Sequence, residues 1–284
     1  MNLKPIFRFA PSPNGFLHLG HAYSALLNFH YAKKINADFL LRIEDIDLAR
    51  SKKVFIDAIY QDLTWLGLSW QKPILMQSSN FNSYKKAANH LIEMDLLYPC
   101  FCTRKEIAKN AIKKDPDGAP LYNEHCKILS KGDVVKKISD SLPHQWRLNM
   151  DEAIKQTGNL TYLSAQPNPT SKLIEHQIRP QDWGDVVILR KDYPTSYHLS
   201  VVIDDAAQNI SHIVRGKDLQ HSTDVHRILQ KLLGLNSPIY THHDLILDDD
   251  NLKLAKSKNS MAIRDLREQG LSAKEIKEKF GFNL

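Results

Sequence analysis

The stretch that decides the fold is Phe7-Arg8-Phe9-Ala10-Pro11-Ser12-Pro13-Asn14-Gly15-Phe16-Leu17-His18-Leu19-Gly20-His21. It opens with a short apolar run, residues 6–9, that is suited to a buried strand. Two prolines and Gly15 then break the run into a turn, and a helical pattern begins at Leu17. The sequence therefore predicts a strand, a turn and a helix, which is the arrangement of a nucleotide-binding unit.

Two histidines stand at the predicted helix start. His18 and His21 are three residues apart, so on a helix they share one face. The backbone N–H groups of a helix start attract phosphate, and two imidazole N–H donors would add to that attraction. Each histidine taken alone is more often a local cap or a packing residue. Their spacing, the preceding turn and Gly20 together favour a phosphate-binding role.

Length and composition are those of a folded globular protein. The 284 residues can bury a substantial core, and we expect a domain that is split by an insertion. Hydrophobic residues make up 42% and charged residues 25% of the chain, which are ordinary values. The net charge of +6 fits a polyanionic partner such as RNA, although many basic proteins bind no nucleic acid.

Several common classes of protein are disfavoured by motifs that the sequence lacks. No apolar run approaches the roughly 20 residues of a membrane span, and the N-terminus lacks a signal core, so we expect a cytoplasmic protein with no membrane partner. The chain has no G-x-x-x-x-G-K-[ST], G-x-G-x-x-G or H-E-x-x-H motif, and no H-x-E with P-C-x-x-C. Ordinary kinases, dehydrogenases, zinc proteases and deaminases are therefore disfavoured.

A second buried strand is predicted at residues 39–43, and acidic residues follow directly after it. Strand ends are where parallel α/β sheets bind ligands, so Glu44, Asp45 and Asp47 could hold an ammonium group or a metal-bound phosphate. Alternatively they are solvated loop carboxylates, the interpretation that we favour for Asp47.

Apolar runs further along predict a second α/β half that joins the first sheet. The predicted strands are residues 146–148, 186–189, 197–202 and 210–214, and the predicted helices are residues 51–65 and 84–97 and one that ends at Leu233. The strand at 197–202 is followed by Asp204 and Asp205. A basic loop at 252–258 either closes over phosphates or is a solvated surface loop. Residues 260–284 predict a surface helix.

The cysteines flank a basic segment that we interpret as part of an inserted module. Residues 104–137 hold nine Lys or Arg against five Asp or Glu. Cys100, Cys102 and Cys126 could supply three thiolates to zinc, whose structural sites use four tetrahedral ligands. The alternative is three buried thiols without a metal.

The fourth zinc ligand has several candidates close before Cys126. These are Tyr122, Glu124 and His125. From chemistry alone, His125 is the first choice.

Taken together, these segments resemble the class I aminoacyl-tRNA synthetases, and specifically the glutamyl type. The first signature of that family matches Arg8-Phe9-Ala10-Pro11-Ser12-Pro13 with His18-Leu19-Gly20-His21. A degenerate form of its second signature matches Lys253-Leu254-Ala255-Lys256-Ser257, with Leu where Met is usual. Its glutamate-pocket segments match Arg42-Ile43-Glu44-Asp45, Tyr197-His198-Leu199 and Val214-Arg215-Gly216.

The resemblance implies an α/β fold, with a Rossmann-like catalytic domain on a parallel sheet that is split by an inserted zinc-containing domain. The expected catalytic domain is residues 1–98 and 194–245, and the zinc-binding, acceptor-type insertion is residues 99–193. Residues 246–284 would form the lysine-signature loop and a helical C-terminal extension. Only 28 residues follow Lys256, too few for the anticodon-binding domain of a full glutamyl-tRNA synthetase.

The chain therefore resembles a truncated paralogue of that family, which attaches glutamate to queuosine in the anticodon of tRNA(Asp). The implied partners are ATP, L-glutamate and the anticodon arm of tRNA(Asp), and we expect a monomer. The implied cofactors are Mg²⁺ with ATP and one structural Zn²⁺ per chain. The zinc ligands of the subfamily match Cys100, Cys102, Tyr122 and Cys126, so that Tyr122 replaces His125.

The implied chemistry has two steps. The α-carboxylate of glutamate attacks the α-phosphorus of ATP, giving glutamyl-adenylate and pyrophosphate, and a hydroxyl of the queuosine cyclopentene ring then attacks the activated carbonyl. The implied catalytic residues are His18, His21 and Lys256, and these three with Gly20 bind ATP. The implied glutamate-binding residues are Arg8, Ala10, Ser12, Glu44, Tyr197 and Arg215. Arg8 and Arg215 would pair with the side-chain carboxylate, and Glu44 would receive the α-ammonium.

Two other functions remain open from the sequence. A minimal glutamyl-tRNA synthetase that charges a tRNA 3′ end shares every activation residue, and only the missing C-terminal domain argues against it. A non-catalytic tRNA-binding paralogue is the second, and the presence of Lys256 argues against that.

Overall fold

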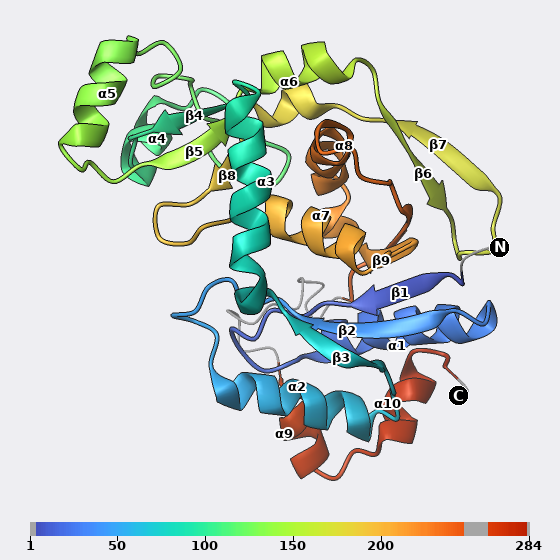
Figure 1. Ribbon diagram of the computed structural model, residues 1–284. Helices are drawn as coiled ribbons and strands as arrows, with labels where there is room; N and C mark the ends of the chain where they lie inside the picture. The colour runs from blue at the N-terminus through green and yellow to red at the C-terminus, as the bar shows by residue number, and fades with distance from the viewer. Residues whose placement is uncertain (1–3, 247–260, 283–284) are drawn as a thin grey trace.

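The computed structural model describes residues 4–246 and 261–282, and its largest element is a seven-stranded sheet (Figure 1). In the order in which they pair, the strands are β3 (Gln71–Met76), β2 (Asp38–Ile43), β1 (Ile6–Phe9), β9 (His212–Gly216), β10 (Ile239–His243), β6 (Thr161–Ala165) and β7 (Leu173–Gln177). All neighbouring strands are parallel except the last two. The predicted α/β fold with a mainly parallel sheet is therefore confirmed. No helix of the described ranges is long and apolar enough to cross a membrane.

Helices cover both faces of the sheet (Figure 1). The lower face in the view carries α1 (Leu19–Lys34), α2 (Lys53–Trp65), α9 (Ile263–Glu268) and α10 (Ala273–Lys279). The upper face carries α3 (Phe81–Glu93), α6 (Met150–Thr157), α7 (Tyr197–Ala207) and α8 (Ser222–Leu232). Side chains alternate along a strand, so Ile213 packs into the upper core and Val214 into the lower one. The sheet thus separates two apolar cores.

The first strand-helix-strand unit follows the sequence prediction closely. β1 pairs with β2 in parallel, with Phe7 opposite Phe39, and α1 connects them. Phe7, Leu26 and Leu41 are buried in the lower core. The helix begins at Leu19, two residues later than expected, because His18 is its N-cap.

The predicted strand at residues 197–202 is wrong, because these residues begin the helix α7. A buried helix and a buried strand both appear in sequence as a continuous apolar run, and length is what separates them. The helix continues to Ala207, and the Ser196 hydroxyl caps it by accepting from the N–H of Leu199. Asp204 and Asp205 therefore lie within a helix, on its buried side.

The strands β6 and β7 form an antiparallel hairpin that the sequence did not predict. Tyr240 of β10 pairs in parallel with Ser164 of β6, so the hairpin completes the large sheet. Residues 161–177 lie inside the segment 99–193 that we assigned to the insertion. Part of the segment that we expected to form the insertion therefore belongs to the large sheet.

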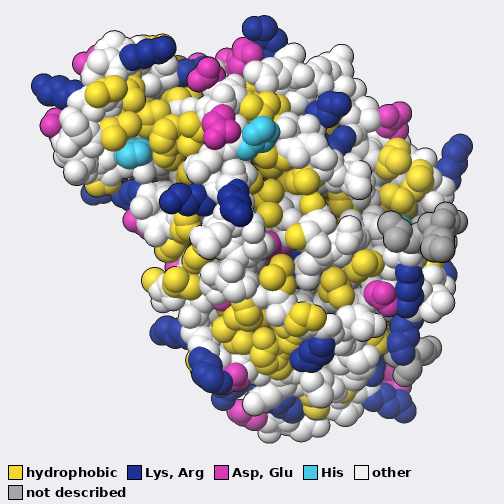
Figure 2. Space-filling view, viewed as in Figure 1, with side chains coloured by type: hydrophobic (Ala, Val, Ile, Leu, Met, Phe, Trp, Pro, Cys, Tyr) yellow, Lys and Arg dark blue, Asp and Glu magenta, His cyan; other side chains and the backbone are white. Residues whose placement is uncertain are grey.

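A second, smaller sheet projects from the body of the molecule. It is antiparallel, and its strands are β4 (Leu97–Cys100), β5 (Gln145–Leu148) and β8 (Val187–Leu189). With α4 (Arg104–Asn110) and α5 (Lys131–Ser139) it forms what we call the insertion lobe, residues 97–148 with β8. Figure 2 shows this lobe projecting at the upper left, with hydrophobic side chains on its surface. Val135 and Ile138 of α5 are among the exposed ones.

The C-terminal region forms two short helices where the sequence predicted one. Gly270 separates α9 from α10 with a φ of 91°, a conformation that few other residues adopt. Ile263 and Ile276 are buried against α1 and α2, so the region packs on the lower core. The remaining elements are the short 3₁₀ helices η1 (Gln77–Asn80), η2 (Pro180–Trp183) and η3 (Lys217–Leu219).

Candidate active site

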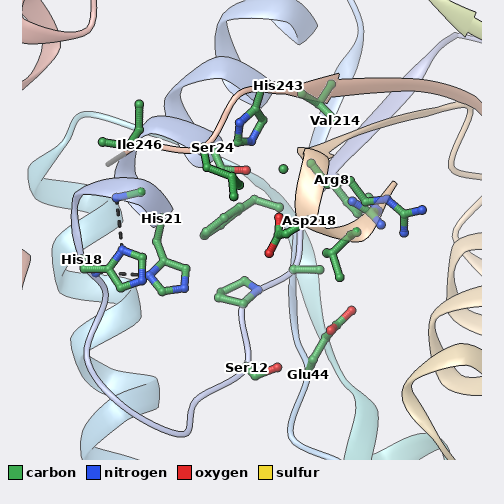
Figure 3. Close-up of a pocket in the computed structure, with 18 of the residues that line it drawn as sticks. Arg8, Ser12, His18, His21, Ser24, Glu44, Val214, Asp218, His243 and Ile246 are labelled. Atoms are coloured by element: carbon green, nitrogen blue, oxygen red, sulfur yellow. Dashed lines mark hydrogen bonds between the residues drawn. The ribbon is translucent and has the colours of Figure 1, made fainter. Parts of the chain in front are cut away.

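A cavity of about 610 Å³ opens at the carboxyl ends of β1, β2 and β9 (Figure 3). Open parallel sheets bind ligands at this edge. The predicted glutamate and ATP residues that line it are Arg8, Ala10, Ser12, His18, Gly20, His21, Glu44, Tyr197 and Arg215. Lys256, the remaining predicted residue, lies outside the described residues. Segments far apart in the sequence thus converge on one cavity.

His18 and His21 lie side by side at one end of the cavity, with ring centroids 3.8 Å apart (Figure 3). The Nδ1 atom of His18 accepts from the backbone N–H of Gly20 at 3.1 Å, and Nδ1 of His21 accepts from the N–H of His18 at 3.2 Å. These hydrogen bonds assign the proton of each neutral ring to Nε2. The capping and phosphate-binding interpretations are therefore compatible, because each ring caps through Nδ1 and carries its donor on Nε2.

Gly20 leaves the space that the His18 ring occupies. A Cβ atom at this position would lie 3.1 Å from Cε1 and 3.2 Å from Nδ1 of His18. Both distances are shorter than ordinary van der Waals contact. Any side chain at position 20 would press on the ring that caps the helix.

Of the three carboxylates after β2, only Glu44 lines the cavity. Asp45 is buried and accepts hydrogen bonds from the backbone N–H and the hydroxyl of Ser78, at 2.8 and 2.6 Å. Asp47 accepts from Arg50 and from the Tyr193 hydroxyl. Asp45 and Asp47 therefore fix loops, and Glu44 alone points toward the cavity (Figure 3).

A buried network of four charged groups joins the strand ends to α7. Asp205 accepts from Nε and Nη2 of Arg8 at 3.0 and 3.3 Å, and from Nη1 of Arg42 at 2.7 Å. The Nη2 atom of Arg42 also donates to Glu44 at 3.2 Å. Two cations thus face two carboxylates, which balances the charge of the network.

The pKa values in this network reflect both burial and the paired charges. Burial opposes ionisation of Asp205, but the Arg42 and Arg8 guanidinium groups outweigh it and hold the pKa of Asp205 below its usual value. For Glu44 the balance is reversed, because burial raises its pKa despite the same two arginines. The network is therefore tightest around Asp205.

Arg215 lies in the same cavity in a different environment. It is buried, and its Nη1 atom donates to the Tyr197 hydroxyl at 3.4 Å. Its other acceptors are neutral side chains of α8 and β10. Arg8 and Arg215 both reach the cavity, but only Arg8 has an anionic partner among the described residues.

Sequence reasoning missed several residues of the site. Asp205 was placed at a strand end, whereas the helix α7 turns it toward β1 and β2. Ser24, Asp218 and His243 also line the cavity. Ser24 follows His21 by three residues on the same helix, a spacing that could have identified it. His243 lies on β10, a strand that was not predicted.

The three cysteines form a separate cluster in the insertion lobe. Their Sγ atoms all lie within 4.8 Å of one another, and those of Cys102 and Cys126 are 3.5 Å apart. Tetrahedral Zn–S bonds of about 2.3 Å place sulfur atoms about 3.8 Å apart. The geometry of the cluster therefore fits a zinc site.

Tyr122 is a buried member of this cluster, and His125 is not. The Tyr122 side chain is buried against Cys100 and Cys126, and its hydroxyl oxygen accepts from the N–H of Cys126 at 2.7 Å. The Arg147 guanidinium lies 3.9 Å from the centroid of the Tyr122 ring. His125 is exposed. Tyr122 is consequently better placed to complete a four-ligand site.

The fold and the cavity together define a class I tRNA synthetase catalytic domain. The family model for "tRNA synthetases class I (E and Q), catalytic domain" matches residues 6–278, and the chain belongs to this family. The "Glutamyl-Q tRNA(Asp) synthetase" of Rhodobacter capsulatus is 42% identical over 287 aligned residues, which cover 97% of this chain and 99% of that protein. The resemblance that the motifs indicated is thus confirmed.

Full-length synthetases match over part of their length. The "Glutamate--tRNA ligase" of Aquifex aeolicus is 36% identical, covering 93% of this chain and 54% of its own. The crystal structure of the glutamate-tRNA synthetase from Elizabethkingia anophelis has a TM-score of 0.74 at 25% identity, covering 94% of this chain and 54% of that one. The chain spans about half the length of these two relatives.

Proposed function

We propose that this chain activates L-glutamate with ATP and transfers the glutamyl group to the queuosine base in the anticodon of tRNA(Asp). The observation that carries the proposal is the alignment with a glutamyl-Q tRNA(Asp) synthetase over 97% of this chain and 99% of that relative. The convergence of the phosphate-binding and carboxylate-binding side chains on one cavity supports it.

In the first step, an oxygen of the glutamate α-carboxylate attacks the α-phosphorus of ATP, and pyrophosphate leaves. The Nε2–H groups of His18 and His21 stabilise the negative charge that grows on the phosphate oxygens. ATP binds as its magnesium complex, and Lys256 stabilises charge on the same phosphates. Because the cavity holds both substrates together, much of the acceleration comes from positioning.

The glutamate side chain lies at the other end of the cavity. Arg8 and Arg215 bind its carboxylate, while Glu44 accepts a hydrogen bond from its α-ammonium group. Ala10, Ser12 and Tyr197 complete the wall. In Figure 3, Arg8 and Glu44 lie at the end opposite the histidines, so the reacting carboxylate would sit between the two groups.

In the second step, a hydroxyl of the queuosine cyclopentene ring attacks the carbonyl carbon of glutamyl-adenylate, and AMP leaves. The anticodon arm of tRNA(Asp) is the proposed RNA partner, and the lysines and arginines of residues 104–137 contribute phosphate contacts. Because ATP and tRNA are its substrates, we place its activity in the cytoplasm.

We propose one structural zinc per chain, held by Cys100, Cys102, Tyr122 and Cys126. The spacing of the sulfur atoms and the buried Tyr122 hydroxyl support this set. Zinc bound there would join the end of β4 to the segment around Cys126, a structural role away from the cavity.

The proposed function is tested by finding where glutamate becomes attached. Purified chain, ATP and labelled glutamate are incubated with tRNA(Asp) that contains or lacks queuosine, and the RNA is then digested and its fragments separated. Label on the anticodon fragment, only when queuosine is present, is the expected result. Removing the terminal CCA sequence should leave this labelling unchanged, because the 3′ end does not take part.

A minimal glutamate–tRNA ligase is the second candidate, because the full-length ligase of Aquifex aeolicus is 36% identical to this chain over 54% of its own length. It predicts label on the 3′-terminal adenosine and none after the CCA sequence is removed. That result would replace the first proposal. No glutamate-dependent exchange of pyrophosphate into ATP by zinc-loaded protein would refute both.

A further inference from the structure

Within the part of the chain that the structure describes, Arg215 forms hydrogen bonds to neutral groups alone. It is 4% exposed and lies on β9. Its Nε atom donates to Nε2 of His242 at 3.3 Å, and its Nη2 atom donates to the Thr223 hydroxyl at 2.8 Å. Its Nη1 atom lies 3.4 Å from both the Tyr197 hydroxyl and Nδ1 of His226.

Arg8 and Arg215 therefore differ in whether a carboxylate of the described residues balances their positive charge. Arg8 forms two hydrogen bonds to Asp205, which is also bound by Arg42. No carboxylate of residues 4–246 or 261–282 lies within ion-pair distance of Arg215. Buried charges are usually paired, so a buried arginine on the wall of a cavity whose described partners are all neutral suggests a missing anion.

The fold brings the two histidines to Arg215 from different elements. His242 is directly opposite Arg215 on the neighbouring strand β10. Thr223 and His226 are three residues apart in the first half of α8, so they share a face. Both histidines are buried. Their positions are therefore fixed by the sheet register and by helix packing.

The hydrogen bonds require both histidines to be neutral, because a protonated imidazole has no acceptor atom. Two causes lower the pKa of His226 well below its usual value: burial is the larger one, and repulsion from the Arg215 charge is the second. The same two causes lower the pKa of His242 to about 2. Because Nδ1 of His226 accepts from Arg215, its proton lies on Nε2, which is 3.4 Å from Nδ1 of His198. Each ring thus presents a lone pair to the guanidinium.

We propose that His226 and His242 are positioning residues that hold the Arg215 guanidinium through neutral acceptor atoms, leaving its charge for the side-chain carboxylate of the amino-acid substrate. This inference rests on the proposed function and makes it more specific. Arg8 orients the side-chain carboxylate of the substrate, and Asp205 balances the positive charge of Arg8. Arg215 supplies the unbalanced charge that selects glutamate over glutamine, because a neutral amide leaves that charge unpaired.

The test compares two substitutions of nearly the same shape. His242→Gln can place an amide oxygen near the position of Nε2, whereas His242→Glu places a carboxylate there. We expect the Glu variant to pair with Arg215 and to raise the KM for glutamate by about 10-fold to 100-fold, the value of a hydrogen-bonded charge. Its preference for glutamate over glutamine should fall with little change in kcat. The Gln variant should retain a glutamate KM closer to that of the native chain.

A second pair tests the same idea from α8. His226→Asn can place its side-chain oxygen near the position of Nδ1, and His226→Asp adds a negative charge at that place. The measured quantities are KM and kcat for pyrophosphate exchange with glutamate and with glutamine, and thermal unfolding verifies folding. Nitrogen-15 spectra of the native chain add a measurement that needs no variant. They should show both rings neutral from pH 6 to 8, with the His242 proton on Nδ1 and the His226 proton on Nε2.

The outcomes separate this inference from the proposed function. Native chain without glutamate-dependent exchange refutes the function itself. The positioning role is refuted if the native chain is active but the Gln and Glu variants at position 242 raise the KM for glutamate and lower selectivity equally. The pair at position 226 would have to give the same result. A protonated His226 or His242 ring in the native spectra also refutes it, even where every variant fails to fold.

Discussion

The cavity at the sheet edge and the cysteine cluster of the insertion lobe are held in place by different means. The cavity residues extend from strands and helices packed between two large apolar cores, and Asp205 links α7 to Arg8 and Arg42. The cluster of Cys100 and Cys126 belongs to a core with only three buried residues. Two large apolar cores therefore support the cavity, whereas the proposed zinc would supply much of what holds the lobe together.

Zinc removal should have the largest effect, and the effect should be confined to the lobe. Structural zinc contributes roughly 10 kcal/mol to the folding of small zinc domains. After removal of zinc by a chelator and restoration of Mg²⁺, amide exchange should accelerate over residues 100–126 and remain slow in β1 and α1. Glutamate-dependent pyrophosphate exchange should persist, and transfer to tRNA should fall.

Elemental analysis provides the control for the zinc experiment, and about one zinc per chain is the expected content. Tyr122→Phe should lower the zinc affinity, while His125→Ala should leave it unchanged. Equal loss of amide protection in the lobe and around the cavity would show that the two regions are not independent.

Asp205→Asn should be the most destabilising change at the cavity. It leaves Arg8 and Arg42 buried without their shared anion, and removal of one partner from a buried ion pair costs about 3 to 5 kcal/mol. Urea unfolding of both proteins measures the difference. Asp57→Asn is the matched control, because Asp57 pairs with Lys53 at the surface and should contribute less than about 1 kcal/mol.

The difference in unfolding free energy between the native and Asp205→Asn chains should depend on pH. The pKa of Asp205 is lower in the folded chain than in the unfolded one, so its contribution is present above the unfolded value of about 4. It is lost as the pH falls through the folded pKa. The difference in unfolding free energy between native and Asp205→Asn chains should therefore shrink below about pH 4. A constant difference would exclude ionised Asp205 as its source.

His21→Ala should affect catalysis more than stability. Loss of one donor to a developing phosphate charge should lower the exchange rate by about 100-fold to 1000-fold. The matched change in the lobe is Ser130→Ala, which removes the N-cap of α5. Each substitution should lower the unfolding free energy by about 1 kcal/mol. Equal exchange rates for both variants would restrict His21 to a capping role.

Replacing either of two glycines at the same helix position by alanine should have the smallest effects. The change should be favourable at Gly132 and unfavourable at Gly20. Gly20 and Gly132 are each the second residue of a helix, after the N-caps His18 and Ser130. A Cβ at 20 would press on the His18 ring at 3.1 Å, whereas one at 132 meets only the Ser130 hydroxyl at 3.8 Å. Gly132→Ala should stabilise the chain by at most about 1 kcal/mol.

Gly20→Ala should instead lower the exchange rate by about tenfold, the equivalent of one lost cap. Exchange kinetics and thermal unfolding of both variants verify the contrast. A Gly20→Ala variant with native kinetics would show that the His18 ring tolerates displacement.

The sequence predicted how the first half of the candidate site is assembled, because its residues are close together in the chain. A strand, a proline-rich turn and a capped helix are local features, and they bring Arg8, Ser12 and His18 to one end of the sheet. The three cysteines within 27 residues do lie together, as a shared metal site would require, while their use as zinc ligands stays a prediction.

The second half was harder because its contacts are distant in sequence. Residues 197–202 form a buried apolar run, and such a run does not distinguish a helix from a strand. The partnership of Asp205 with Arg8 spans 197 positions, and His242 reaches Arg215 only through the strand pairing of β9 and β10. Neither pairing leaves a local pattern in the sequence.

The environment of Arg215 has a kinetic consequence. The side-chain carboxylate of glutamate takes no part in either proposed bond change, so it remains ionised from substrate to glutamylated RNA. A guanidinium with no anionic partner among the described residues would therefore attract the product as it attracted the amino acid. Departure of the modified RNA has to break that ion pair in a buried place, where salt screens little. The feature that makes entry selective would thus also slow release, and turnover would be limited by the exit of the product.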